Sequence, residues 1–222
     1  MRHFIFILVA YTCLFSAVSA DEWNIYPPSN NVSAIALEGD YLWWTSYASI
    51  VRYNRLDGSH RVYTLRDYGE GFWFTAAAVA PDGLKWFGTN NSTVVRYDNS
   101  GWSTTKVNYP VRVIGFDRDG LAWFGTFHGV ACFDGVKWKL YGAAEGFADR
   151  EVNALALDHN GNLWFGTERD GLFRFDGNTW TQYLPGKVNL PDDTIYSLAC
   201  DSEGTLWAGT SKGLARFNGT VW

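Results

Sequence analysis

The sequence predicts an all-β fold, a β-propeller of about five four-stranded blades. A short Trp–aromatic–Gly–Thr segment recurs five times, and apolar runs separated by glycine-containing turns surround each copy. The first tryptophans of the five copies are separated by 43, 37, 41 and 43 residues: Trp43, Trp86, Trp123, Trp164 and Trp207. Propeller repeats have a period of roughly 40–50 residues, so the spacing is that of blades.

The fourth copy shows the plan within one repeat. Residues 152–157 form an alternating run, a turn follows through Asp158 to Gly161, and residues 163–167 form a second run. Residues 172–175 and 179–183 predict a third and a fourth strand. Short aromatic and β-branched runs joined by Asp-Gly or Asn-Gly turns predict a four-stranded antiparallel sheet. After residue 20 the sequence has no sustained helical period.

The chain holds twelve tryptophans, which could suggest a ligand-binding surface. Their positions favour blade packing, because the repeat accounts for all but Trp73. The second-strand position holds five of them, and Trp44 takes the place of the following aromatic residue. The fourth-strand position holds five more: Trp23, Trp102, Trp138, Trp180 and Trp222.

Residues 1–20 are typical of a secretory signal peptide: basic residues, an apolar run and a small-residue end at Ala20. The apolar run is too short for a membrane span, which needs about 20 residues. The residues before Cys13 form a poor lipobox. The sequence therefore predicts an exported protein, periplasmic or extracellular, with a propeller domain over residues 21–222 and no direct membrane insertion.

The charge balance excludes one class of partner. The net charge is −5, and loss of Arg2 with the leader makes it more negative. Without a basic stripe we expect no nucleic-acid partner. Cys132 and Cys200 lie in apolar runs at different strand positions, so we expect two buried free thiols, with a disulfide as the alternative. No motif indicates a cofactor or a metal site.

The repeats resemble a known family. The segments 158–167 (Asp-x-Asn-Gly-Asn-Leu-Trp-Phe-Gly-Thr) and 171–176 (Gly-Leu-Phe-Arg-Phe-Asp) are similar to the two-component regulator propeller repeat. The resemblance extends from about residue 23 to residue 222 and is weakest in the first copy, where Thr45-Ser46 replaces Gly-Thr. It implies the periplasmic sensor region of a hybrid histidine kinase, a setting in which many members sense glycans.

Two arrangements of the whole chain stay open. The segment beginning at Trp23 repeats the form of the strand beginning at Trp180, so it can supply the outer strand of the last blade and close a five-blade ring. Such a clasp would remove open strand edges. Alternatively, the chain is the front part of a longer propeller protein, as the resemblance implies.

Functional residues are expected on the face where strand two turns into strand three and where one blade leads to the next. The inter-blade connections 67–73, 142–151 and 184–193 are long and variable, and such loops on a rigid scaffold often carry function. The candidate ligand-binding residues are Phe72, Trp73, His128, Asp149, Arg150, Glu168, Arg169 and Lys212, with Glu151 beside Arg150. Trp73 could stack on a sugar ring or could plug the core. The polar candidates could contact a ligand or be solvated.

Two recurring patterns favour structural roles. An arginine recurs in strand three at Arg52, Arg96, Arg174 and Arg216, and its recurrence once per blade argues against an anion site. Segments such as 117–120 resemble half of a calcium loop but lack its further ligands, so we interpret them as hairpin turns.

Catalytic residues are not apparent. The histidines after the leader, His60, His128 and His159, are not expected to converge, and no nucleophile motif or phosphate loop is present. The main hypothesis is a sensory propeller that binds a small molecule or oligosaccharide and signals to a membrane partner or downstream domain. The alternatives are a propeller hydrolase or lyase, similar to the enzymes that open macrolactone antibiotics (virginiamycin B lyase-like), and a protein-binding scaffold.

Overall fold

The computed structural model describes residues 31–69 and 73–222. Within them the chain folds into five antiparallel sheets, each made of strands consecutive in sequence, which confirms the all-β propeller prediction. The predicted leader, the segment beginning at Trp23 and Phe72 lie outside the described residues.

Each sheet is one blade, and the blades are numbered in chain order. Blade one contains β1 (Ala34–Glu38), β2 (Tyr41–Thr45), β3 (Ile50–Asn54) and β4 (His60–Tyr63). Blade two contains β5 (Phe74–Val79), β6 (Lys85–Thr89), β7 (Thr93–Tyr97) and β8 (Trp102–Lys106). Blade three contains β9 (Val111–Phe116), β10 (Ala122–Thr126), β11 (Val130–Phe133) and β12 (Trp138–Tyr141). Blade four contains β13 (Val152–Leu157), β14 (Leu163–Thr167), β15 (Leu172–Phe175) and β16 (Trp180–Tyr183). Blade five contains β17 (Ile195–Cys200), β18 (Leu206–Thr210) and β19 (Gly213–Phe217).

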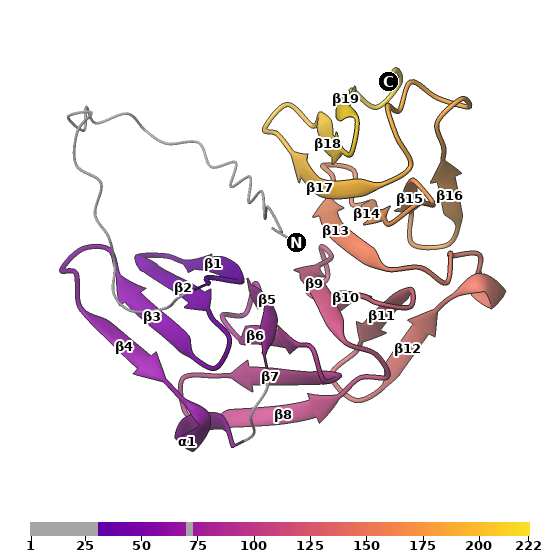
Figure 1. Cartoon of the computed structure of the whole chain (residues 1–222). Helices are drawn as coiled ribbons and strands as arrows, with labels where there is room; N and C mark the ends of the chain where they lie inside the picture. The colour runs from indigo at the N-terminus through magenta and orange to yellow at the C-terminus, as the bar shows by residue number, and fades with distance from the viewer. Residues whose placement is uncertain (1–30, 70–72) are drawn as a thin grey trace.

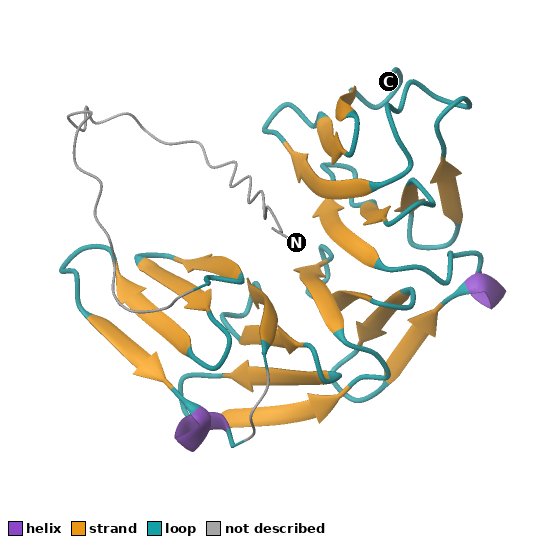
Figure 2. Ribbon diagram, viewed as in Figure 1, coloured by secondary structure: helices purple, strands orange, loops and turns teal. Residues whose placement is uncertain are grey.

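The blades follow one another along an arc (Figure 1). The first strands pack in succession, β1 beside β5, β5 beside β9, β9 beside β13 and β13 beside β17. The outermost strands β4, β8, β12 and β16 lie on the convex side of the arc (Figure 1). Two single helical turns, α1 (Leu65–Tyr68) and η1 (Ala143–Glu145), lie in inter-blade connections (Figure 2). Sequence periodicity could not reveal helices this short.

The acids in the turns of the repeat accept hydrogen bonds from the second-strand tryptophans. The indole Nε1 of Trp123 donates to Asp117 at 2.9 Å, and that of Trp164 donates to Asp158 at 2.9 Å. Blades one and five use the pairs Trp43–Glu38 at 2.8 Å and Trp207–Asp201 at 2.8 Å. The same acids accept turn amides, as Asp117 does from Leu121 N at 2.9 Å. The interpretation of these segments as hairpin turns is therefore confirmed.

The recurring arginines also have a structural role, as predicted. Each is the cross-strand partner of the second-strand tryptophan of its own blade, for example Arg96 opposite Trp86. Its guanidinium carbon lies over the indole ring, at 5.2 Å for Arg96 and 5.9 Å for Arg174. Arg96 also lies 5.7 Å from the ring of Phe133 in blade three, so it spans two blades. Such cation–π contacts stabilise packed aromatic surfaces.

The two ends of the arc are not packed against each other. Leu214 in β19 is 62% exposed, whereas the residues at its position in the other blades, Ile50, Val94, Val130 and Leu172, are buried. Leu172 is covered by Leu190 and Ile195, which lead into blade five. The described blades are therefore an open arc, and they do not show the closed five-blade ring that the sequence left as one possibility.

Cys132 and Cys200, the cysteines within the described residues, are free, as predicted. Cys132 is buried and Cys200 is half-buried. Burial raises the pKa of Cys132 above its ordinary value and that of Cys200 to about 11. Thiolates are the reactive form of cysteine, so both thiols are expected to react slowly at neutral pH.

Candidate functional site

The inter-blade connections and the turns between second and third strands gather on one face, which we call the connection face. It is formed by residues 46–49, 64–69, 73, 90–92, 107–110, 127–129, 142–151, 168–171, 184–194 and 211–212. Every exposed large aromatic side chain of the described residues lies on this face or at its margin: Tyr47, Trp73, Tyr109, Phe127 and Tyr196. The other exposed large apolar side chains are aliphatic.

The repeat motif itself makes the turns of this face rigid. The threonine that ends the Trp-Phe-Gly-Thr segment closes the turn: Thr126 Oγ1 donates to Gly129 O at 2.9 Å, and Thr167 Oγ1 donates to Gly171 O at 2.8 Å. Gly129 has φ +77°, and a Cβ there would lie 2.4 Å from Tyr141 O. Glycine is therefore required at this position.

Backbone hydrogen bonds join the turns of blades three and four to the connection that enters blade four. Gly129 N donates to Arg150 O at 2.9 Å, and Glu168 N donates to Glu151 O at 2.9 Å. These bonds place Arg150 and Glu151 between the turns of blades three and four. The scaffold thereby fixes the positions of the side chains that the turns carry.

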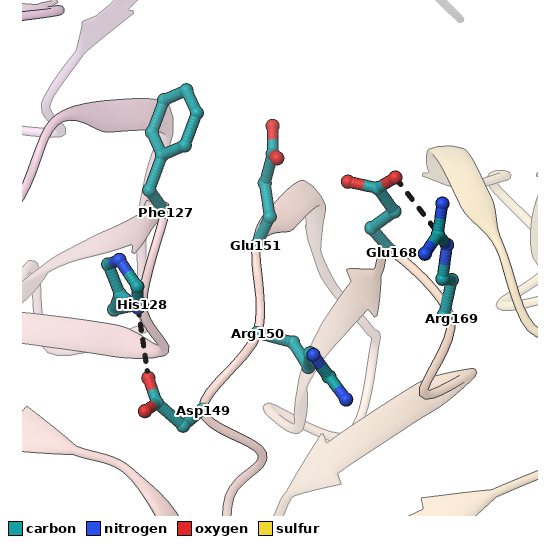
Figure 3. A pocket seen from close by; sticks show the side chains of 7 residues that line it. All are labelled: Phe127, His128, Asp149, Arg150, Glu151, Glu168 and Arg169. Carbon is teal, nitrogen blue, oxygen red and sulfur yellow. Dashed lines mark hydrogen bonds and ion pairs between the residues drawn. The ribbon is translucent and has the colours of Figure 1, made fainter.

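A pocket of about 220 Å³ opens at this junction. It is lined by Phe127, His128, Asp149, Arg150, Glu151, Glu168 and Arg169. The side chains of Phe127, Glu151 and Glu168 extend in the same direction from three neighbouring segments (Figure 3). The volume is below the roughly 300–1,000 Å³ typical of drug-sized sites, so the pocket suits a single small ring or group.

A half-buried carboxyl pair, Glu151 and Glu168, is the main electrostatic feature of the pocket. Burial raises the pKa of Glu151 above its ordinary value of 4.5; Arg112 opposes the shift, and a hydrogen bond with Glu168 and the charge of that group add to it. Arg112 Nη2 lies 2.7 Å from Glu151 Oε1, and its guanidinium lies 5.2 Å from the Phe127 ring centre. The pair can both donate and accept hydrogen bonds, which suits a ligand rich in hydroxyl groups.

Hydrogen bonds and ion pairs link most of the remaining polar side chains at the pocket rim. His128 Nδ1 lies 3.3 Å from Asp149 Oδ1, and Arg150 Nε donates to Asp170 Oδ2 at 3.0 Å. Arg169 Nε lies 3.8 Å from Glu168 Oε1 (Figure 3). Arg169 has φ +75°, an unusual backbone conformation for a residue other than glycine. The pocket rim therefore carries both acidic and basic side chains.

The structure brings five of the predicted residues together and places Trp73 and Lys212 apart from them, while Phe72 lies outside the described residues. His128, Asp149, Arg150, Glu168 and Arg169 line the one pocket. Trp73 is 58% exposed, so it does not plug the core, and it lies at the junction of blades one and two. Lys212 lies in blade five, where its Nζ is 2.6 Å from Asp192 Oδ2.

Sequence reasoning missed Arg112 and Phe127, and it gave Glu151 only a minor place. Arg112 is the second residue of β9, a position where blade four has Asn153 and blade two has Thr75. Side chains at this position reach the next blade: Arg112 Nη2 donates to Asn153 Oδ1 at 3.1 Å. The signal that could have found it is a long polar residue at the start of a first strand.

Within the described chain, no group of three or more His, Cys, Asp or Glu residues is arranged to hold a metal ion. No helix there is long and apolar enough to cross a membrane. The three described histidines lie apart: His60 begins β4 rather than lying in a turn, and His159 lies beside Gly204.

These blades and their motif define the class of protein. The family model of the two-component regulator propeller matches residues 146–169 and 189–212. The chain thus carries two segments that match the two-component regulator propeller repeat, as the resemblance implied, and its five sheets are arranged as the blades of a β-propeller. No curated protein matches the chain.

Solved structures support the same fold. The extracellular domain assigned to the hybrid two-component system BT4673 of B. thetaiotaomicron is similar with a TM-score of 0.73 and 22% identity, over 88% of this chain and 28% of that one. Virginiamycin B lyase of Staphylococcus aureus gives a TM-score of 0.70 at 18% identity, over 84% and 69%. PorZ, a surface component of the type-IX secretion system of Porphyromonas gingivalis, gives 0.69 at 18%, over 87% and 32%. The chain spans less than a third of the two-component domain it matches.

Proposed function

We propose that this propeller is an extracytoplasmic sensor module that binds an oligosaccharide at the pocket between blades three and four. One observation supports this most directly: the Glu151–Glu168 pair lies beside Phe127 on a rigid, water-accessible rim. Sugars are bound by carboxylate hydrogen bonds to hydroxyl groups and by the apolar face of the ring against an aromatic side chain. The pocket has both kinds of group.

The setting of the module is part of the same proposal. The two-component regulator repeat and the similarity to the extracellular domain of a two-component system support a role in signalling. The predicted leader at residues 1–20 supports export to the periplasm or the exterior. The occupied propeller would pass its signal to a membrane partner or to a downstream signalling domain.

The test is a binding screen on the intact chain without its predicted leader. Linear gluco-, cello-, xylo- and manno-oligosaccharides of two to six units are measured by isothermal titration calorimetry. We expect at least one series to bind. Glu151→Gln and Glu168→Gln are each expected to weaken that binding by about tenfold or more, because each variant loses charged hydrogen bonds to the sugar.

A matched control separates the site from general surface effects. Glu203→Gln alters an exposed acid in the β17–β18 turn at the opposite end of the strands and is expected to leave affinity unchanged. Absence of binding by every series, or equal loss in the control, would contradict the proposal.

A lyase is the second candidate function, and one observation favours it. His128 lies in the pocket with its Nδ1 held by Asp149 at 3.3 Å. An inactive histidine variant of the similar virginiamycin B lyase was solved with quinupristin, so a histidine matters in that enzyme. Incubation with quinupristin and mass analysis for the ring-opened product test this candidate, and His128→Ala must abolish any turnover found.

A further inference from the structure

A second aromatic surface lies on the connection face, outside the pocket. Of the tryptophans that the structure describes, Trp73 alone is exposed, at 58%. Its ring packs edge to face on Tyr47, which is 51% exposed, with ring centres 5.1 Å apart and an interplanar angle of 62°. The other described tryptophans are buried or half-buried, whereas this pair lies in water, at a cost in unburied apolar area.

The backbones that carry the two rings are anchored. Trp73 N donates to Asn90 Oδ1 at 3.0 Å, and Asn90 N donates to Trp73 O at 2.9 Å. The turn of Tyr47 is closed by the Ser46 N to Ser49 O bond at 2.9 Å, and Tyr68 Oη donates to Ala48 O at 2.7 Å. The rings are therefore presented in a fixed geometry, which lowers the entropy lost when a ligand is bound.

A hydrogen-bonding group accompanies the rings. The Oδ1 atom of Asn90 is used by Trp73, so its amide nitrogen is the donor that remains for a ligand hydroxyl. Asn91, also exposed, follows it in the same turn. A flat apolar surface edged by amide groups suits a pyranose ring, which has an apolar C–H face and a polar circumference.

The junction between this pair and the pocket also carries aromatic rings. Tyr109 lies in the connection from blade two to blade three and packs on His128, with ring centres 4.8 Å apart. Tyr109 is 36% exposed and Phe127 is 37% exposed. Exposed rings therefore occur at three successive blade junctions, from Tyr47 and Trp73 to the pocket, whose volume suits only one ring.

We propose that Tyr47 and Trp73 form a second sugar-ring subsite, a stacking platform that binds the distal units of an oligosaccharide whose end enters the Glu151–Glu168 pocket. This inference rests on the proposed function. It adds that the ligand is a chain of several sugar units, and that affinity depends on its length.

The test measures affinity against ligand length. Di- and hexasaccharides of the series that binds in the screen are titrated against the wild type, Trp73→Ala, Tyr47→Ala and the ring-conserving Tyr47→Phe. The wild type is expected to bind the hexasaccharide more tightly. Trp73→Ala is expected to lose about tenfold on the hexasaccharide and nothing on the disaccharide, since aromatic contacts contribute on that scale.

The variants are matched to separate outcomes. Tyr47→Phe keeps the ring and should bind like the wild type, whereas Tyr47→Ala should behave like Trp73→Ala. Leu56→Ala removes another exposed apolar side chain, 77% exposed and in the β3–β4 turn, and serves as the control. Unfolding curves confirm that each variant is folded.

Failure of the platform and failure of the proposed function give different results. If the wild type binds the hexasaccharide and Trp73→Ala binds it equally well, the platform is contradicted and the pocket stands. If Trp73→Ala weakens both lengths alike, the ring is not a distal subsite. If no saccharide binds the wild type, the proposed function fails and the platform fails with it.

Discussion

The side chain of Ile195 occupies the space above Gly166, where a Cβ atom on Gly166 would lie 2.5 Å from Ile195 Cγ2. Ile195 is the first residue of β17, and Gly166 belongs to the Trp-Phe-Gly-Thr segment of the preceding blade. The same contact joins Gly88 to Val111 at 2.5 Å and Gly125 to Val152 at 2.6 Å. The glycine of the repeat thus leaves the space into which a β-branched side chain from the next blade packs.

The first prediction exchanges this glycine. Gly166→Ala forces the new methyl group against Ile195, and overpacking of this kind costs about 1–3 kcal/mol. Gly209, at the same position in blade five, meets no residue of another blade among the described residues, and its Cβ would meet the flexible Ser197 Oγ at 2.5 Å. Denaturant unfolding should show Gly166→Ala clearly destabilised and Gly209→Ala near the wild type. Equal losses of stability in the two variants would contradict the packing role of this glycine between blades.

A second prediction concerns the acid that holds Trp164. Burial opposes the charge of Asp158, but hydrogen bonds from Asn162 and Trp164 outweigh it and lower its pKa below the ordinary value of 3.8. Since the folded-state pKa is lowered, this stability is present above pH 3.8 and is lost as pH falls through the folded value. Asp158→Ala should cost about 1–3 kcal/mol at pH 7, because a buried indole N–H loses its acceptor. A smaller loss at pH 7 than in acid would contradict this account.

In blade two the missing acid can be added instead of removed. Ala80 stands where the other repeats have an acid, and Trp86 Nε1 is buried with no hydrogen-bond partner. Ala80→Asp should give that N–H an acceptor and raise the free energy of unfolding by about 1 kcal/mol. Ala80→Ser, too short to reach the indole, is the control. A destabilised Ala80→Asp would show that burial of the new charge outweighs the bond.

The raised pKa of Glu151 makes a pH prediction with the opposite sign. Because the folded state binds this proton more tightly, stability falls as pH rises from 4.5 through the raised folded value. Glu151→Gln cannot ionise, so it should flatten that slope and be more stable than the wild type at neutral pH. Urea unfolding from pH 4 to pH 8 measures the slope, and an unchanged slope would contradict the raised pKa of Glu151.

The thiols should be unreactive in the folded protein. Burial raises the pKa values of Cys132 and Cys200, the latter to about 11, so little thiolate exists at pH 8. A chromogenic disulfide reagent should label neither group quickly in the native state and both groups in denaturant. Fast native labelling of either residue, assigned with Cys132→Ala and Cys200→Ala, would show that its environment is more open.

The blade plan could be predicted almost residue by residue because turn chemistry and strand period are local. In blade four the strands match the prediction, except that β16 begins at Trp180 rather than at residue 179. The structural roles of the turn acids and arginines were also predictable, because recurrence once per blade argues against a single site. The open arc was not decided, because it depends on how blades stack rather than on the plan of one blade.

The candidate site was predictable as a region but not as a set of contacts. The turn position of His128 and Glu168 and the variable connection holding Arg150 indicated the face on which the pocket lies. The contribution of Arg112 depends on contacts that its side chain makes with the next blade, and the period of the sequence does not predict such contacts. The exposure of Trp73 and its partner Tyr47 likewise depends on side-chain directions in two loops far apart in sequence.

The most direct test of the account is hydrogen–deuterium exchange with and without a saturating oligosaccharide from the screen. We predict slower exchange at residues 127–129, 149–151 and 168–171, with unchanged exchange in the opposite turns at 118–121 and 159–162. Protection confined to those opposite turns, or protection nowhere on the connection face, would contradict the claim that this face binds the ligand.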